Sequence, residues 1–128
     1  MQRHPDLPQA FADLGIDVPI LKALHKMGYE TPSEIQREMI PCALEGRDIL
    51  GQARTGTGKT AAFGIPTLQQ LDGNQRLQAL CLAPTRELAV QVTGEVRRLS
   101  EFTGLRCVAV YGGQKIQAQV KQAASSGS

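Results

Sequence analysis

The chain has 128 residues, of which 41% are hydrophobic and 20% charged, and its formal net charge is +2. These values are ordinary for a soluble globular protein, the length suits one small domain, and no apolar run is long enough to cross a membrane. The charge is too small to argue for a nucleic-acid partner, and the basic residues of the second half are typical of a solvated surface. No signal-peptide pattern opens the chain, so we expect a cytoplasmic protein.

The three cysteines, Cys42, Cys81 and Cys107, lie far apart and form no Cys-x-x-Cys pair. This spacing predicts neither a metal site nor a disulfide framework. Cys81 and Cys107 stand inside apolar runs, so we interpret them as small core residues in a reducing compartment.

Two helices are predicted in the first third of the chain. The first covers about residues 19–27 and stops at Gly28. The second opens at Thr31, which we expect as the N-cap with Glu34 closing a capping box, and it ends near Gly46.

A glycine-rich loop follows a short apolar segment, 48–52, and precedes a helix-compatible stretch, 59–71. Strand, loop and helix in this order are typical of a loop that wraps nucleotide phosphates, although the strict pattern has glycine where Ala53 stands. Lys59 supplies an ammonium for the β- and γ-phosphates, and the Thr60 hydroxyl is suited to Mg²⁺. The alternative is a surface glycine turn followed by a chance Lys-Thr pair. The loop comprises Ala53, Arg54, Thr55, Gly56, Thr57, Gly58, Lys59 and Thr60.

The second half of the chain alternates predicted strands with predicted helices. Residues 77–83 and 105–111 are near-continuous apolar runs, as expected for strands buried in a parallel sheet. Helices are predicted over about 86–100 and 114–124. This alternation predicts an α/β fold with a parallel sheet and a ligand at the carboxyl ends of the strands.

A second motif lies upstream of the phosphate loop, where Gly28 to Gln36 contains an aromatic ring, Tyr29, and a carboxamide, Gln36. An aromatic face stacks on a base, and a glutamine both donates to and accepts from one edge of adenine. The alternative for Gln36 is a solvent-facing helix residue.

This segment closely resembles the Q motif of DEAD-box ATP-dependent RNA helicases, including Phe11 seventeen residues before Gly28. Residues 53–60 look like motif I of that family, 84–89 like its motif Ia, and Gly112-Gly113 like its GG element. The resemblance implies a three-layer RecA-like P-loop NTPase fold with a mostly parallel sheet. It makes 1–124 a partial helicase ATP-binding domain with the Q motif over 11–36, and leaves 125–128 as a flexible tail or engineered addition.

The same resemblance implies roles for individual residues. Tyr29 becomes the adenine-stacking ring, Gln36 the adenine reader and Phe11 an aromatic that packs against this site. Loop 53–60 binds the phosphates of ATP or ADP, with Lys59 and Thr60 as the catalytic residues and Thr60 as a ligand of Mg²⁺. Arg54, beside them, stands where the family commonly has glutamine.

RNA-backbone contacts are implied for Thr85, Arg86, Gly112 and Gly113, because hydroxyl, guanidinium and backbone N–H groups recognise phosphate without reading sequence. The alternative for Arg86 is an ion pair with Glu87 at the start of a helix.

The sequence contains neither the Asp-Glu-Ala-Asp segment nor the Ser-Ala-Thr segment of the family. We therefore expect nucleotide binding without efficient hydrolysis, weak or absent RNA binding by this chain alone, and an incomplete sheet. An open sheet edge also predicts a homodimer. Two alternatives stay open: a stand-alone, non-catalytic nucleotide-binding or interaction module, and a small kinase, which explains the phosphate loop but not Gln36 or residues 84–89.

Overall fold

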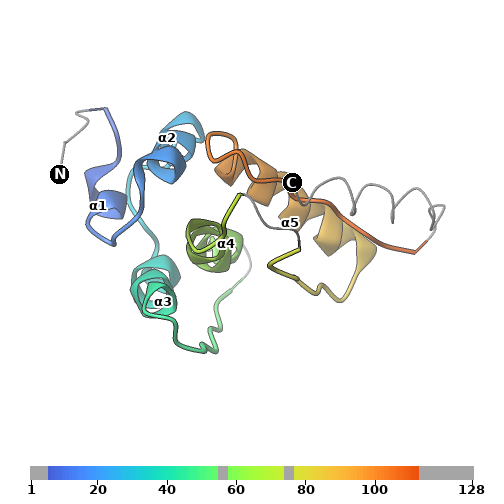
Figure 1. The fold of residues 1–128 in the computed structure, drawn as a ribbon. Helices are drawn as coiled ribbons and strands as arrows, with labels where there is room; N and C mark the ends of the chain where they lie inside the picture. Colours follow the sequence, from blue (N-terminus) through green and yellow to red (C-terminus); the bar gives the residue numbers. More distant parts are fainter. Residues whose placement is uncertain (1–5, 55–57, 74–76, 113–128) are drawn as a thin grey trace.

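The computed structural model describes residues 6–54, 58–73 and 77–112 of the chain. Over these residues the chain forms the helices labelled in Figure 1. The predicted helix 114–124 and the tail 125–128 lie outside the described residues, as do Thr55, Gly56, Thr57 and Gly113. In chain order the helices are α1 (Gln9–Ala12), α2 (Val18–Lys26), α3 (Glu34–Leu44), α4 (Lys59–Gln69) and α5 (Arg86–Leu99).

Helices α2 to α5 confirm the helices predicted from the sequence for these segments. The predicted N-cap of α3 is wrong: Ser33, not Thr31, caps the helix, and its side chain accepts a hydrogen bond from the backbone N–H of Gln36. The Gln36 side chain bonds back to the Ser33 N–H, so the capping box is Ser33 with Gln36. The sequence interpretation also missed α1, which is too short to show a helical period.

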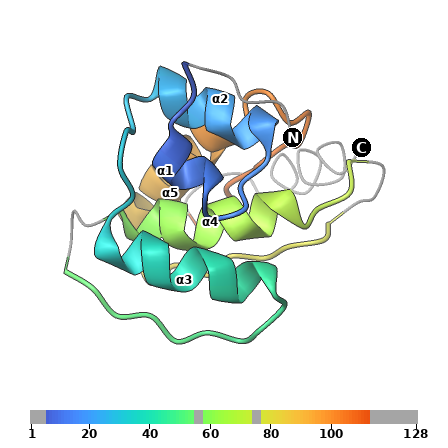
Figure 2. The ribbon, with the colours of Figure 1, turned by 90° about the vertical axis from the view of Figure 1, so that its left-hand side faces the viewer.

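Helix α4 lies between α3 and α5, as both Figure 1 and Figure 2 show. Helix α2 packs on α5, and α1 packs on α2. An apolar cluster lies between the helices. Helix α4 contributes Ala61, Ile65 and Leu68 to it. The largest side chains that are fully buried include Phe11, Ile20, Leu24, Ile40, Ile65 and Leu99.

The predicted parallel sheet does not form among the described residues. Segments 48–52, 77–83 and 105–111 form no helix or strand there, and the first two of these segments run as drawn-out traces in Figure 2. Leu50, Leu80 and Leu82 are 99%, 85% and 84% exposed. A parallel strand is held by ladder hydrogen bonds and by cover on both faces, and the described residues supply neither to these segments.

The segments nevertheless lie along particular helices. A Cβ on Gly51 would collide with the Met39 side chain, so the chain before the phosphate loop runs close against α3. Arg97 of α5 donates from Nε to the carbonyl of Cys107 at 3.0 Å, which holds segment 105–111 on α5. The position of each of these two predicted strands is therefore set by a helix contact without a sheet.

Candidate functional site

The N-terminal end of α4 carries the described part of the phosphate loop. Its N-cap is Gly58 with φ 82°, a left-handed conformation that suits glycine, and no side chain caps the helix. The N–H groups in the first turn of any helix have no partner within that helix. In α4 the N–H of Ala62 donates to the Gly58 carbonyl at 3.1 Å.

The first turn of α4 also lacks an acidic residue, whereas α3 and α5 begin with side-chain caps and with Glu34 and Glu87. Lys59 is exposed at this end and Thr60 follows it. An uncapped helix end beside an ammonium and a hydroxyl fits a phosphate group.

Gln36 lies directly on this loop. Its side chain is 3% exposed, its Nε2 donates to the Gly58 carbonyl at 3.1 Å, and its Oε1 accepts from the Ser33 N–H at 2.9 Å. The alternative of a solvent-facing Gln36 is therefore wrong. Each atom of the carboxamide keeps one further hydrogen-bonding position, so the group is able to meet a base edge as well. The capping role was visible in the sequence as Ser33-x-x-Gln36 and was missed.

Tyr29 and Phe11 form a second part of the candidate site. Their ring centroids are 6.2 Å apart with an interplanar angle of 27°, and Phe11 is fully buried. The Tyr29 hydroxyl donates to Glu95 Oε1 of α5 at 2.9 Å. The structure thus brings together the two aromatics that the sequence interpretation assigned to the adenine side, and adds Glu95, for which the sequence carries no signal.

Burial raises the pKa of Tyr29 above its ordinary value of 10.0, and the hydrogen bond to Glu95 raises this pKa further. The negative charge of Glu95 acts in the same direction, while Arg98 opposes it. Tyr29 is therefore a neutral hydrogen-bond donor at physiological pH.

Few described side chains at this site are of the kinds that bind a magnesium ion. Among the described residues no group of three or more His, Cys, Asp or Glu side chains is placed to hold a metal ion. Thr60 in the first turn of α4 fits the usual arrangement, in which Mg²⁺ takes one or two protein ligands and completes its shell with phosphate oxygens and water.

The predicted RNA-contact residues meet at the N-terminal end of α5. Thr85 caps this helix, its Oγ1 accepting from the Leu88 N–H at 3.1 Å. The Arg86 guanidinium lies over the Tyr111 ring, 4.8 Å from the centroid, and Gly112 follows Tyr111. Across the described residues no ion pair joins Arg86 to Glu87, so the alternative given for Arg86 is not seen. Tyr111 was missed, because nothing in its sequence context marks it.

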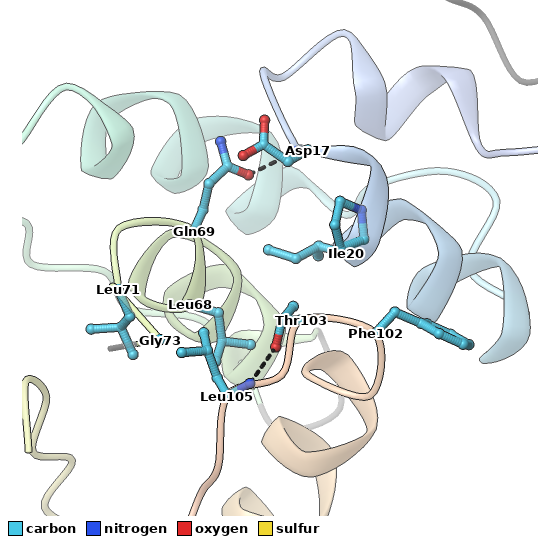
Figure 3. A pocket seen from close by; sticks show the side chains of 10 residues that line it. Asp17, Ile20, Leu68, Gln69, Leu71, Gly73, Phe102, Thr103 and Leu105 are labelled. Carbon is cyan, nitrogen blue, oxygen red and sulfur yellow. Dashed lines mark hydrogen bonds between the residues drawn. The ribbon is translucent and has the colours of Figure 1, made fainter. Parts of the chain in front are cut away.

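A partly open pocket of about 180 Å³ lies at the other end of α4, as Figure 3 shows. Because Leu68 and Gln69 line it, the pocket is separated from Gly58 by most of the length of α4, on the order of 15 Å at 1.5 Å per residue. It is therefore not part of the candidate nucleotide site. In the described parts of the chain, no helix combines the length and apolar character needed to cross a membrane.

Comparison with known proteins places these features in a family. The sequence profile of the family described as DEAD/DEAH box helicase matches residues 33–127. The chain is 55% identical over 113 residues to the ATP-dependent RNA helicase DeaD of Escherichia coli strain K12, covering 87% of this chain but only 18% of that protein.

Two solved structures are similar over most of the chain. One is a DEAD box protein from Methanococcus jannaschii, with a TM-score of 0.78 and 39% identity, covering 88% of this chain and 31% of that one. The other is Dbp5 from S. cerevisiae bound to RNA and ADP BeF3, with a TM-score of 0.75 and 33% identity over 84% of this chain and 29% of that one.

The family profile covers most of the chain, and it includes the capping box of α3, the phosphate-loop helix and the Arg86 end of α5. The helices are arranged as in the corresponding part of a solved DEAD box protein, and the chain spans less than a third of the proteins it matches. This chain belongs to the DEAD/DEAH box helicase family.

Proposed function

We propose that the chain forms the adenine-nucleotide cradle of an RNA helicase, within a partial ATP-binding domain over 1–124. In this proposal ATP or ADP binds with Mg²⁺ through loop 53–60, with Lys59 on the phosphates and Thr60 on the metal. Gln36 reads the adenine, and Tyr29 and Phe11 supply the aromatic side of the site.

One observation carries the proposal: the buried Gln36 carboxamide is hydrogen-bonded to the carbonyl of Gly58, the residue that opens α4. The side chain proposed to read adenine is thereby held against the residue at which the proposed phosphate-binding loop enters α4. Such preorganisation lowers the ordering cost of binding.

The proposed RNA contacts are Thr85, Arg86, Gly112 and Gly113. The Thr85 oxygen accepts a helix N–H, which leaves its own proton able to donate to a phosphate. RNA-dependent ATP hydrolysis with duplex unwinding is proposed for a longer protein that contains the acidic segment. For this chain alone we propose binding without efficient hydrolysis, because a metal-holding carboxylate, a positioned water and transition-state cations are all needed.

The remaining proposals concern the setting of the chain. A cytoplasmic setting stays a proposal, and the prediction that Cys81 is a core residue is wrong, because Cys81 is exposed. A homodimer through an open sheet edge stays a prediction without support, because no strand forms among the described residues. Light scattering after size exclusion at several concentrations tests it, and a monomer at every concentration would contradict it.

The nucleotide proposal is tested by thermal-shift titration of the chain with Mg-ADP and with Mg-GDP. A ligand that binds only the folded state adds about 2.7 kcal/mol of stability at a hundredfold excess over its Kd. We expect stabilisation by ADP in preference to GDP, and loss of this preference in Gln36→Ala.

Because Gln36 also caps α3, Ser33→Ala is the matched control. It removes the other half of the capping box at a cost of about 1 kcal/mol but leaves the Gln36 carboxamide able to read adenine. Ser33→Ala should therefore melt earlier and keep the ADP preference. Equal response to ADP and GDP in the unmodified chain, or an ADP response unchanged by Lys59→Ala, would overturn the proposal.

A further inference from the structure

At the N-terminal end of α5, Arg86 contacts Tyr111, a residue that the proposed RNA contacts do not include. Arg86 lies in the first turn of the helix with its guanidinium 4.8 Å from the centroid of the Tyr111 ring. A cation at this end opposes the helix dipole, so helix stability does not account for it. Within the described residues no carboxylate forms an ion pair with Arg86 either.

We propose that Tyr111 is a positioning residue that holds the Arg86 guanidinium for an RNA phosphate, which rests on the RNA contact proposed above for Arg86. A ring occupies the face of a guanidinium and leaves its in-plane N–H donors available. Those donors are the ones that form a fork with two phosphate oxygens. Without the ring, a long exposed side chain samples many rotamers, and binding has to order it.

The path of the chain explains why Tyr111 arrives at this end of α5. Arg97 anchors the Cys107 carbonyl, and Tyr111 follows four residues later. Four drawn-out residues cover about 13 Å, and the eleven residues from Arg97 back to Arg86 cover about 16 Å of helix. Residues 107–111 therefore run back along α5, from Arg97 to Arg86, as Figure 1 shows.

Neighbouring groups extend the same surface. Thr85 precedes Arg86, and Gly112 follows Tyr111. A Cβ added to Gly112 would meet nothing within 4 Å, so a ligand is able to approach the backbone there. Hydroxyl, guanidinium and unobstructed backbone together recognise a phosphate chain rather than a base sequence.

The test measures binding of a fluorescent single-stranded RNA to the chain by anisotropy, at low ionic strength and over a salt series. The variants are Tyr111→Leu, which keeps apolar bulk without the ring, Tyr111→Phe, which keeps the ring, Arg86→Ala, and the double variant. An exposed cation–π pair predicts about two- to fivefold weaker binding for Tyr111→Leu and near-normal binding for Tyr111→Phe.

The salt dependence separates positioning from general damage to the fold. Loss of one phosphate contact lowers the salt slope by about 0.7 for a single strand, and we expect this in both Arg86→Ala and Tyr111→Leu. The double variant should bind no more weakly than Arg86→Ala. Melting temperature and ADP stabilisation should be unchanged, because Arg86 is exposed and neither Arg86 nor Tyr111 belongs to the apolar cluster between the helices.

The outcomes separate the two proposals. If Arg86→Ala weakens RNA binding and Tyr111→Leu does not, the positioning role is overturned and the RNA contact stands. If Arg86→Ala has no effect on RNA binding, both are overturned. The contact between Arg86 and Tyr111 is also tested without RNA, by NMR. The Arg86 Nε–H resonance should shift in Tyr111→Leu but much less in Tyr111→Phe. An unmoved resonance in Tyr111→Leu would show that the pair is absent in solution and would overturn the positioning role.

Discussion

At the scale of single residues, side chains in the candidate site have structural and chemical roles at once. Gln36 closes the capping box of α3 and bonds the Gly58 carbonyl, and the same carboxamide is proposed to read adenine. Tyr29 packs on Phe11 and is tied to α5 through Glu95. A substitution at either position is therefore expected to change folding as well as the proposed nucleotide binding, and its interpretation needs a matched variant.

Gly58→Ala is predicted to destabilise the chain and abolish the ADP response. The residue has φ 82°, which costs a residue with a Cβ about 1–2 kcal/mol, and the new Cβ would also collide with Gln36 Nε2. Gly46→Ala is the control, because Gly46 has φ 86° and nothing within 4 Å of its Cβ position. Urea unfolding should show a larger loss of unfolding free energy for Gly58→Ala than for Gly46→Ala. Equal losses would contradict a contact between Gln36 and Gly58.

Alkaline pH is predicted to weaken the fold through Tyr29. Because the folded-state pKa of Tyr29 is raised above 10.0, the folded state holds the proton more tightly than the unfolded state does. This contribution is fully present below about pH 10 and is lost as pH rises through the raised value. The difference in unfolding free energy between the unmodified chain and Tyr29→Phe should therefore shrink above pH 10, and a difference that stays constant with pH would contradict the prediction.

At the scale of elements, the helices differ in how their N-terminal ends are capped. Ser33 caps α3 and Thr85 caps α5, while α4 begins at an uncapped glycine beside a lysine. An end left without a cap or an acidic residue is less stable by itself and more favourable for an anion. Helix α2 also lacks a side-chain cap, but it begins after Asp17, whose charge disfavours an anion, whereas α4 begins with Gly58 and Lys59.

Gly94→Ala is predicted to stabilise α5 by about 1 kcal/mol. Gly94 lies in the interior of this helix, nothing lies within 4 Å of its Cβ position, and alanine is the better helix former by that amount. Thr85→Ala should act in the opposite direction by about 1 kcal/mol, because it removes the cap. Chemical denaturation of both variants checks the sign of each change in unfolding free energy. A destabilising Gly94→Ala would mean that another part of the chain contacts α5 at Gly94.

At the scale of the whole molecule, the helices form the core and the apolar segments lie outside it. Leu99 is fully buried between α5 and its neighbours, whereas Leu82 is 84% exposed. The chain covers only 31% of a similar solved DEAD box protein. The stability of this chain by itself should therefore come from helix packing.

Leu99→Ala is predicted to cost about 2–5 kcal/mol of unfolding free energy, and Leu82→Ala less than about 0.5 kcal/mol. Amide hydrogen exchange should be fast over 77–83 and slowest in α4, where the core helices meet. Slow exchange over 77–83, together with a large cost for Leu82→Ala, would show that a sheet forms in solution.

The local geometry of the candidate site was predictable because it depends on neighbours in sequence. Gly58, Lys59 and Thr60 are consecutive, and the predicted glycine turn before a helix is the N-terminal end of α4, while their binding to a phosphate stays a prediction. The ends of α2 and α3 followed from the stop signals at Gly28 and Gly46, whereas the start of α3 after Ser33 and the short helix α1 did not follow from the sequence. Family membership followed from motif order and was confirmed by the profile over residues 33–127.

Contacts between distant parts of the chain were decided only by the tertiary structure. The bonds of Tyr29 to Glu95 and of Gln36 to Gly58, and the placing of Arg86 on Tyr111, join positions far apart in sequence, and no local pattern encodes such pairs. The predicted strands show the same limit, because 77–83 and 105–111 have strand composition but a strand exists only with a neighbour to bond. Composition and spacing determined helices α2 to α5 and the family, while packing decided which side chains meet and whether the apolar segments become a sheet.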